Sequence, residues 1–381
     1  MRNVLAALLL LCSTPALAQQ AAASAPKVAR QADAPIEVVY DWSREKCELW
    51  DIPDAPLRAF RNDRGQVMAY VSDSKGRLYT GADLLTLRHT CDTTFSGRNS
   101  ANPADFNAVA FITATWTADG RHVAALIHEE YHADRYKTCT FKSEMQCWYN
   151  TVIAGTSSDG GHTFSVATPP LLVIAPGFRQ DVEQGRHRGF FNPSNIFAKD
   201  GAWYALAGTT GGQGQKPGQC LLRSPDPADA TSWRAYDGKD FTIRAVNPYG
   251  EGREPYRPCV PVQGLSGTVT VVRHVPSGLY LAVYQTGAEP GYPNGRIAYA
   301  WSSDLLRWSK PETLLNVSSM PSKDCMDQYR YGYPAVADPA SDSRNFDTIG
   351  AAPYLFLTRF HVEKCGLPPN RDLVRVKLRI D

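Results

Sequence analysis

The sequence predicts an all-β protein whose single domain is a five-bladed β-propeller. Short alternating or aromatic runs, bounded by Gly, Pro, Asp and Ser, recur along the chain, and helical periodicity is almost absent. Five segments repeat one layout, and several turns repeat one pattern around an aspartate. A chain of repeated antiparallel units with short turns is typical of a propeller, in which similar sheets surround one axis.

Each of the five segments has a proline at the start of a strand, then a polar turn with Gly or Asp, then an apolar second strand. The prolines are Pro53, Pro103, Pro193, Pro258 and Pro334. The second strands are predicted over residues 67–70, 123–126, 203–206, 279–282 and 354–357. Five such units predict five blades, because each repeat is one unit that buries its apolar face against its neighbours.

The turns between the outer strands repeat as well. Residues 157–164 read SSDGGHTF, a Ser-x-Asp-x-Gly-x-Thr-aromatic turn. In such a turn the Asp accepts backbone N–H groups, the glycine permits a dihedral that other residues avoid, and the aromatic ring packs between blades. Residues 80–87 and 301–308 align with each other and place Asp83 opposite Asp304. These turns predict fold and carry no chemistry.

The two ends of the chain are suited to closing the ring. Residues 373–380 alternate between apolar and basic side chains, and residues 36–42 alternate likewise. We expect one of these strands to complete the blade that begins at the opposite end of the chain, since a ring needs its sheet edges paired.

The first residues predict export. Arg2, an apolar run over residues 4–11 and the small residues Ala16 and Ala18 form a secretory signal peptide over 1–18. Residues 19–35 are rich in Ala, Gln and Pro and are predicted to be a flexible lead-in, with the propeller over 36–381. We therefore expect a periplasmic or secreted protein.

Cysteine usage agrees with an oxidising compartment. Removal of Cys12 with the signal peptide leaves eight cysteines, an even number that predicts disulfides. Cys139 and Cys147 form the clearest pair, because the segment between them is predicted to be a hairpin excursion. The other pairings stay open, and no CxxC spacing indicates a metal site.

Charge and motifs exclude several classes of function. The chain has 40 Lys and Arg against 38 Asp and Glu, without a basic stripe for nucleic acid or a second apolar stretch for membrane insertion. Phosphate loops, dinucleotide fingerprints and GxSxG are absent. We expect a monomer that needs no cofactor, with a structural or site divalent metal left open.

The most unusual string is HEEYH at the end of an apolar strand. Strand alternation places His128, Glu130 and His132 on one face and Glu129 and Tyr131 on the other. A carboxyl group between two imidazoles has a tunable pKa, which suits a general acid or base. A solvated strand edge and a metal site are the alternatives.

Other candidate residues lie near the predicted strand starts. Asp54 follows Pro53, and Asp338 lies near the fifth start, although either can simply shape a turn. Trp148 and Tyr333 can stack on a sugar or fill the core. The full set of predicted substrate-binding residues is Arg58, Arg61, His128, His132, Trp148, Asn195, Glu254 and Tyr333.

The chain resembles the five-bladed glycoside hydrolases of the arabinanase and fructosidase group, with a sialidase-type Asp box at 157–164. It resembles more closely a set of exported bacterial propellers that carry the strings PDxPxRAF, HxEYH, CWYN, PSN and RDLVRV, found here from Pro53, His128, Cys147, Pro193 and Arg371. The resemblance covers essentially the whole mature chain. The usual acidic motifs of the hydrolases are not reproduced, and HxEYH has no counterpart among them.

The resemblance implies Asp54 as the base, Glu130 or Glu254 as the acid, and Asp338 as the residue that orients the acid. The sequence therefore predicts an exported glycoside hydrolase that acts on a poly- or oligosaccharide through paired carboxylates in the propeller funnel. A non-catalytic carbohydrate-binding propeller is one alternative. A metal-dependent hydrolase or lyase that uses His128, Glu130 and His132 is another.

Overall fold

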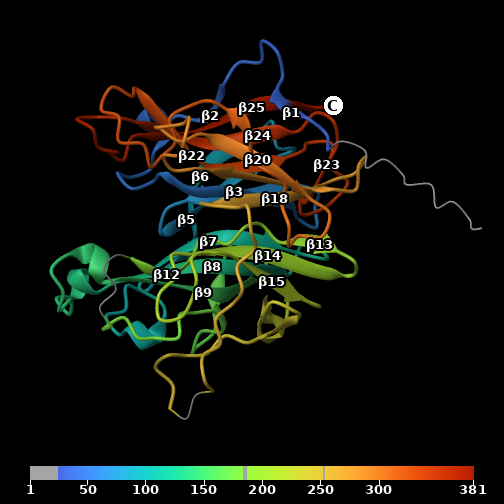
Figure 1. The fold of residues 1–381 in the computed structure, drawn as a ribbon. Helices are drawn as coiled ribbons and strands as arrows, with labels where there is room; N and C mark the ends of the chain where they lie inside the picture. The colour runs from blue at the N-terminus through green and yellow to red at the C-terminus, as the bar shows by residue number, and fades with distance from the viewer. Residues whose placement is uncertain (1–24, 183–186, 252–253) are drawn as a thin grey trace, which may run out of the picture.

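The computed structural model describes residues 25–182, 187–251 and 254–381 (Figure 1). These residues form four β-sheets and only short helices, so the described chain is nearly all-β. The predicted signal peptide and the first part of the predicted lead-in lie outside the described residues. None of the helices in the described ranges is long and apolar enough to cross a membrane.

Antiparallel meanders dominate the first half of the chain. One sheet contains β3 (Pro53–Arg61), β4 (Val67–Ser72), β5 (Lys75–Gly81) and β6 (Arg88–Ser96). The next meander contains β7 (Val109–Trp116), β8 (Val123–His132) and β9 (Trp148–Ser157), with β10 (Ser165–Val166) and β11 (Leu172–Ile174) paired to β9. A further meander contains β14 (Ala202–Thr209), β15 (Gly218–Ser224), β16 (Arg234–Tyr236) and β17 (Phe241–Ile243), with β13 (Phe197–Lys199) paired to β14. Strand β12 (Arg188–Phe191) pairs with both β9 and β14 and joins these two meanders into one sheet.

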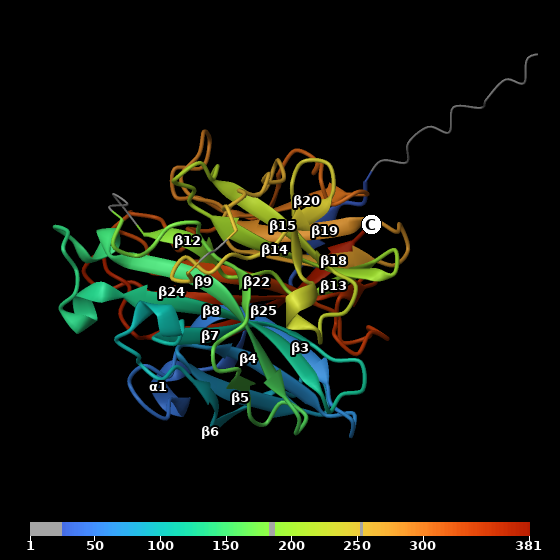
Figure 2. The same ribbon diagram turned by 90° about the horizontal axis from the view of Figure 1, so that it is seen from below.

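Two more sheets complete the described fold. One contains β18 (Val269–His274), β19 (Tyr280–Gln285), β20 (Ile297–Ser302), β21 (Glu312–Leu315) and β23 (Thr348–Ile349). The other contains β1 (Val28–Arg30), β2 (Glu37–Tyr40), β22 (Tyr329–Ala337), β24 (Tyr354–His361) and β25 (Arg371–Ile380). The helical segments are α1 (Trp42–Glu45) and four 3₁₀ turns, at Pro103–Asp105, Ala133–Tyr136, Glu144–Gln146 and Ala230–Ser232. Figure 2 shows successive meanders following one another around the molecule.

The five predicted second strands coincide with β4, β8, β14, β19 and β24, apart from Leu279. The predicted strand starts are less uniform. Pro53 begins β3, whereas Pro103 begins a 3₁₀ turn and Pro258 lies in irregular chain ahead of β18. Pro334 lies within β22, where the pairing with β24 shifts register. Proline lacks an N–H group, so it sits where the ladder is interrupted as readily as where a strand begins.

The two chain ends pair, as the sequence predicts. Strand β2 runs antiparallel to β25, and both lie side by side in Figure 1. Val38 is nevertheless exposed, because the register shifts between Val38 and Tyr40. The prediction of a flexible lead-in is wrong for residues 28–30, which form β1 on β25. Val28 is buried there in an apolar cluster, which offsets the cost of ordering the segment.

The Asp box is confirmed in each of its parts. The carboxylate of Asp159 accepts hydrogen bonds from the backbone N–H and the hydroxyl of Thr163. Gly161 adopts a φ of 90°, and its carbonyl accepts a hydrogen bond from the Tyr70 hydroxyl at 2.6 Å. Phe164 packs edge-on against Tyr70 of the preceding sheet, with ring centroids 5.5 Å apart. The turn therefore fastens two neighbouring meanders together.

We expect Gly161→Ala to lower the free energy of unfolding by about 2 kcal/mol or more. The positive φ strains any other residue, and an added methyl group would overlap the Tyr70 hydroxyl and the Phe60 ring. Gly65→Ala is the matched control, because Gly65 has a φ of 79° but open space around it. Urea unfolding of both variants checks this: equal losses would show that packing at Gly161 contributes nothing.

The described cysteines form four disulfides, and the predicted Cys139–Cys147 pair is confirmed. The other bridges join Cys47 to Cys91, Cys220 to Cys259 and Cys325 to Cys365. Each of these three closes a chain segment of about 40 residues, so each restricts the unfolded chain substantially.

Candidate functional site

A cavity of about 580 Å³ gathers side chains from the first two meanders. Asp54 enters it from the start of β3, Asp73 from the turn between β4 and β5, and Glu130 from the end of β8. His132 and Trp148 line the same cavity. Strand β8 runs antiparallel to β7, so its last residues lie at the same end of the molecule as the first residues of β7. This end of the sheets therefore holds three carboxyl groups in one space.

Asp54 is held by a cation and a hydroxyl. Arg371 at the start of β25 forms an ion pair with its carboxylate. The Tyr333 hydroxyl donates a hydrogen bond to the same group, and burial followed by the charge of Asp54 raises the pKa of Tyr333 well above its usual range. Tyr333 has a φ of 52°, an unusual value for a bulky residue, and its N–H donates to Gln285 Oε1 at 2.7 Å. The strained bulge in β22 thus positions Tyr333 against Asp54.

Glu130 bonds to one of its two neighbouring histidines. Its Oε2 lies 3.0 Å from Nε2 of His132, whose ring stacks on Trp148 with centroids 4.7 Å apart. Trp148 in turn contacts His187 on its other side, at 5.0 Å. Through its Nε2–H group, His132 is placed to donate a hydrogen bond to this carboxyl oxygen.

His128 is buried and fixed by amides. The Asn150 amide nitrogen donates to the Arg188 carbonyl at 2.7 Å, which turns its oxygen toward His128 Nε2 at 3.1 Å. Nδ1 faces Asn192 at 3.2 Å and Glu130 at 3.8 Å. Burial lowers the pKa of His128, so the ring is neutral at neutral pH and carries its proton on Nε2. The buried His128 ring therefore lies in a fixed position beside Glu130.

Asp73 is the site residue that sequence reasoning missed. Burial, followed by the charges of Asp54 and of Glu130, raises the pKa of Asp73 to about 7. The string SDSKG around it reads as an ordinary polar turn, so nothing in the sequence separates Asp73 from a solvated residue. Burial and the neighbouring carboxylates, both of which depend on the fold, raise the pKa of Asp73.

Glu129 lies on the opposite face of β8, as strand alternation predicts. It is buried among apolar side chains and accepts hydrogen bonds from the Ala108 N–H at 3.2 Å and the Thr151 hydroxyl at 3.0 Å. Burial raises the pKa of Glu129 to about 8, so the group is protonated at neutral pH. It takes no part in the cavity.

Glu129→Gln is expected to flatten the dependence of stability on pH and to leave activity nearly unchanged. The wild-type carboxyl binds a proton in the folded state between about pH 4.5 and pH 8, so stability falls as pH rises through this range. The loss is on the order of 4 kcal/mol, and the neutral amide avoids it. Urea unfolding at several pH values measures this. Glu363→Gln, at an exposed position, is the control, and an identical slope in wild type and Glu129→Gln would contradict the assignment.

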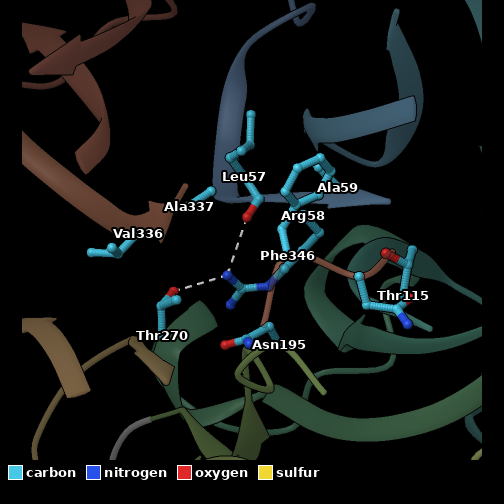
Figure 3. A pocket seen from close by; sticks show the side chains of 10 residues that line it. Leu57, Arg58, Ala59, Thr115, Asn195, Thr270, Val336, Ala337 and Phe346 are labelled. Atoms are coloured by element: carbon cyan, nitrogen blue, oxygen red, sulfur yellow. Dashed lines mark hydrogen bonds between the residues drawn. The ribbon is translucent and has the colours of Figure 1, made fainter. Parts of the chain in front are cut away.

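Arg58 lies on the axis between the sheets and not in the cavity (Figure 3). Its guanidinium donates to the carbonyls of Thr113 at 2.7 Å and Pro193 at 3.3 Å, and to the Thr270 hydroxyl at 2.9 Å. Burial lowers the pKa of Arg58 to about 9, yet the group remains charged at neutral pH. The prediction of a substrate contact is therefore corrected: Arg58 is a buried structural cation.

Four other predicted residues also lie away from the cavity. Arg61 donates to the carbonyls of Ser343 and Pro339, and Glu254 is exposed in a loop. Asn195 pairs through its amide with the backbone of Val271. Asp338 follows the last residue of β22 and accepts the N–H groups of Ala340 and Gly350. The polar groups of Arg61, Asn195 and Asp338 are used within the fold, and none of the four residues lines the cavity.

The metal alternative finds little support in the geometry of the described residues. One group there is close enough to share an ion, namely Cys47, Asp51 and His89, and the Cys47 sulfur is bonded to Cys91. His128 and His132 direct their nitrogens at amide oxygens and at Glu130, as given above. The three residues of the predicted metal set therefore form hydrogen bonds in place of a ligand cage.

Solved structures similar to this chain share its fold. A protein of unknown function from Dyadobacter fermentans DSM 18053 matches with a TM-score of 0.52 and 12% identity, over 93% of this chain and 99% of that one. An N-acetylgalactosamine deacetylase from F. plautii, in complex with blood group B trisaccharide, matches with a TM-score of 0.51 and 11% identity, over 91% and 95%. A GH43_1 enzyme from Xanthomonas citri is similar at a TM-score of 0.48 and 13% identity, over 90% and 91%.

At these identities the similarity is one of fold alone. No protein-family model and no curated protein matches the chain.

Proposed function

We propose that this protein is an exported glycoside hydrolase that acts on an oligo- or polysaccharide. The observation that carries the proposal is the pair of unlike carboxyl groups in one cavity. Asp54 forms an ion pair with Arg371, whereas burial and neighbouring charge raise the pKa of Asp73 to about 7. Acid–base cleavage of a glycosidic bond uses two carboxyl groups in unlike environments of this kind.

We infer that the protein is a propeller of five blades. Arg58 of β3 contacts β7, the segment after β12 and β18, and Thr270 of β18 donates a further hydrogen bond to the Pro334 carbonyl of β22 at 2.8 Å. Four segments, including β3 itself, meet at the guanidinium and β22 joins them through Thr270, and these five inner segments support a ring with this number of blades.

In the proposed reaction, Asp73 donates its proton to the sugar oxygen that leaves as the glycosidic bond breaks. Water attacks the anomeric carbon, and Asp54 takes the proton that the water releases. The ion pair with Arg371 and the Tyr333 hydroxyl orient the Asp54 carboxylate for this step. After one turnover Asp73 has lost a proton and Asp54 has gained one, so Asp54 releases its proton to solvent and Asp73 takes one up before the next turnover.

With Asp73 as the acid, Glu130 has a different role from the one that the sequence predicts. The sequence favours Glu130 as the acid, but Glu130 is hydrogen-bonded to His132, and Asp73 is the cavity carboxyl group whose pKa is raised to about 7. The charge of Glu130 contributes to the raised pKa of Asp73, so Glu130 keeps the acid protonated. It acts through Asp73 and is a positioning residue.

Aromatic groups in the cavity support a carbohydrate as the substrate. Trp148 stands between His132 and His187, and its indole Nε1 makes no hydrogen bond within the described chain. Because the two imidazole rings lie against the indole, Trp148 offers a sugar its N–H group, as a donor to a hydroxyl, and not an open ring face. The F. plautii deacetylase of similar fold was solved with a bound trisaccharide, which supports the same class of ligand here.

The pH dependence of turnover tests the acid. Activity should fall as pH rises through about 7, because Asp73 must be protonated to act. Glu130→Gln should shift this fall to lower pH and reduce turnover at neutral pH by less than about tenfold, since it removes the weaker of the two carboxylate charges that hold the proton on Asp73. The measurement is kcat against pH on a glycan identified by screening bacterial and plant glycans.

A substrate whose leaving group needs no proton tests whether Asp73 acts as the proton donor. Asp73→Asn should lose turnover on the natural glycan and keep most of it on a dinitrophenyl glycoside of the same sugar, whose leaving group departs unprotonated. Equal losses on both substrates would contradict Asp73 as the acid. Glycan binding without turnover by the wild type would favour the binding-module alternative, and activity that EDTA removes and a divalent ion restores would favour the metal alternative.

A further inference from the structure

Two large apolar side chains stand outside the core beside the cavity. Leu49 is 55% exposed and Trp50 is 56% exposed, and both belong to the segment from Cys47 to Asp51 between α1 and β3. A single exposed apolar residue is ordinary on a protein surface. Trp50 differs from such a residue in two ways. Its segment is held in place at both ends, and its side chain lines the cavity.

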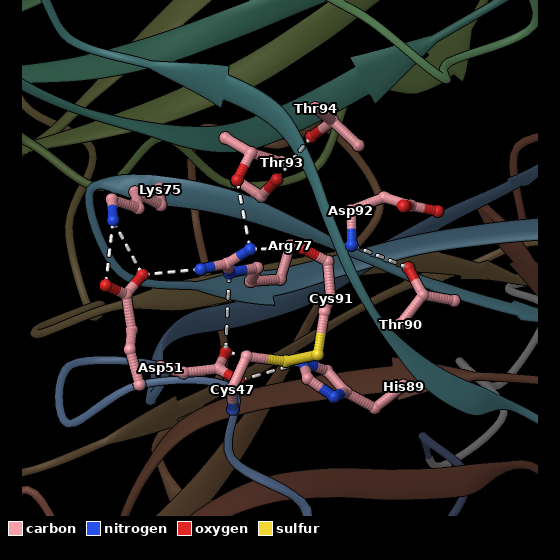
Figure 4. A network of polar contacts seen from close by, with 12 residues as sticks. Cys47, Asp51, Lys75, Arg77, His89, Thr90, Cys91, Asp92, Thr93 and Thr94 are labelled. Carbon is pink, nitrogen blue, oxygen red and sulfur yellow. Dashed lines mark hydrogen bonds and ion pairs between the residues drawn. A yellow bond between two sulfur atoms is a disulfide. The ribbon is translucent and has the colours of Figure 1, made fainter.

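The segment is fixed at both ends (Figure 4). Cys47 is bonded to Cys91 of β6, and the Asp51 carboxylate accepts the Cys47 N–H at 2.8 Å and lies 3.2 Å from His89 Nε2. Between them, Glu48 is held by the ammonium group of Lys75 at 2.8 Å and by Arg77. These links restrict the chain on either side of Trp50, so the indole is held in position for a ligand at low entropic cost.

Trp50 belongs to the outer part of the same cavity. The carboxyl side chains of Glu130 and Asp54 are 13% and 24% exposed, whereas Trp50 is more than half exposed. Trp50, Asp54, Glu130 and Trp148 all line one continuous space. A ligand that extends from the carboxyl groups toward solvent can therefore contact the indole.

We propose that Trp50 is the platform of an outer sugar-binding subsite, on which one ring of a glycan chain stacks while another ring lies at the carboxyl groups. The inference rests on the proposed function and narrows its substrate to a chain of several sugars. The indole face takes the C–H face of a sugar ring, and Glu48 and Lys75 beside it offer an acceptor and donors for its hydroxyl groups. Leu49 does not line the cavity and has no part in the subsite.

Native electrophoresis in gels cast with soluble arabinan, xylan or levan tests the subsite without requiring turnover. At least one of these chains should retard the wild type, and Trp50→Ala should weaken the apparent affinity by about tenfold or more. Trp50→Phe should retain part of the retardation, and Leu49→Ala should be retarded like the wild type. Both residues are exposed, so thermal unfolding should show that all three variants remain folded.

Retardation of Trp50→Ala equal to that of the wild type would overturn the subsite. The subsite would also be overturned if none of the three polysaccharides retarded the wild type. In that case, hydrolysis of short glycosides would still support the proposed function. If retardation depends on Trp50 but the protein hydrolyses no glycan, the result would support the proposed subsite and contradict the proposed hydrolase activity.

Discussion

Asp54→Asn is expected to lower kcat by a factor of about 1000 or more on any glycan that the wild type hydrolyses. The amide cannot take a proton from the attacking water, although it preserves the shape of the group and can still accept the Tyr333 hydrogen bond. Because only one charge changes, at a position open to the cavity, the variant should fold. Turnover measured under saturating substrate checks the expectation.

Chemical rescue distinguishes the base from a residue that only shapes the site. A small anion such as azide or formate should restore part of the activity of Asp54→Ala, since it can occupy the space of the missing carboxylate and act beside Arg371. The same anions should not rescue Asp73→Asn, which lacks a proton donor. An Asp54→Asn protein with wild-type turnover would end the assignment of Asp54.

Arg58→Met is expected to lower the free energy of unfolding by about 3 to 5 kcal/mol. Methionine fills much of the volume but leaves the carbonyls of Thr113 and Pro193 without their donor on the buried axis. The Thr270 hydroxyl also loses a partner, which weakens the contact between β3 and β18. Urea unfolding monitored by tryptophan fluorescence and by circular dichroism measures the loss.

Arg61→Met provides the matched control on the same strand. Arg61 also donates to two carbonyls, but it is only partly buried and lies over the Phe346 ring, so its removal should cost about 1 kcal/mol. Similar losses for the two variants would show that the axial position of Arg58 has no special role.

Local patterns were sufficient for the strands and the turns. The spacing of Ser157, Asp159 and Thr163 predicts the Asp box because all of its hydrogen bonds are made within a few residues. The alignment of the turn at Asp83 with the turn at Asp304 is confirmed for the same reason. Asp83 accepts hydrogen bonds from the N–H groups of Leu85 and Thr86, and Asp304 accepts them from Leu306 and Arg307.

The site was predictable only in part. Alternation along β8 places Glu130 and His132 on one face and Glu129 on the other, and the cavity indeed contains the first two and not the third. Asp73 and Arg371 acquire their importance from neighbours more than 15 residues away in sequence, Asp54 above all. No local pattern carries that information, because a raised pKa depends on which charges the fold brings together.

The sequence by itself determined the elements: alternating strands, aspartate turns, the Cys139–Cys147 bridge and the pairing of the first strand region with the last. These follow from short-range periodicity and from the need to pair sheet edges. Only the tertiary structure decided the use of each charged residue. Arg58 and Asp54 lie in the same strand, four residues apart, yet one is buried on the axis and the other faces the cavity. Burial and the distance to other charges set the role of such groups, and both are properties of the assembled sheets.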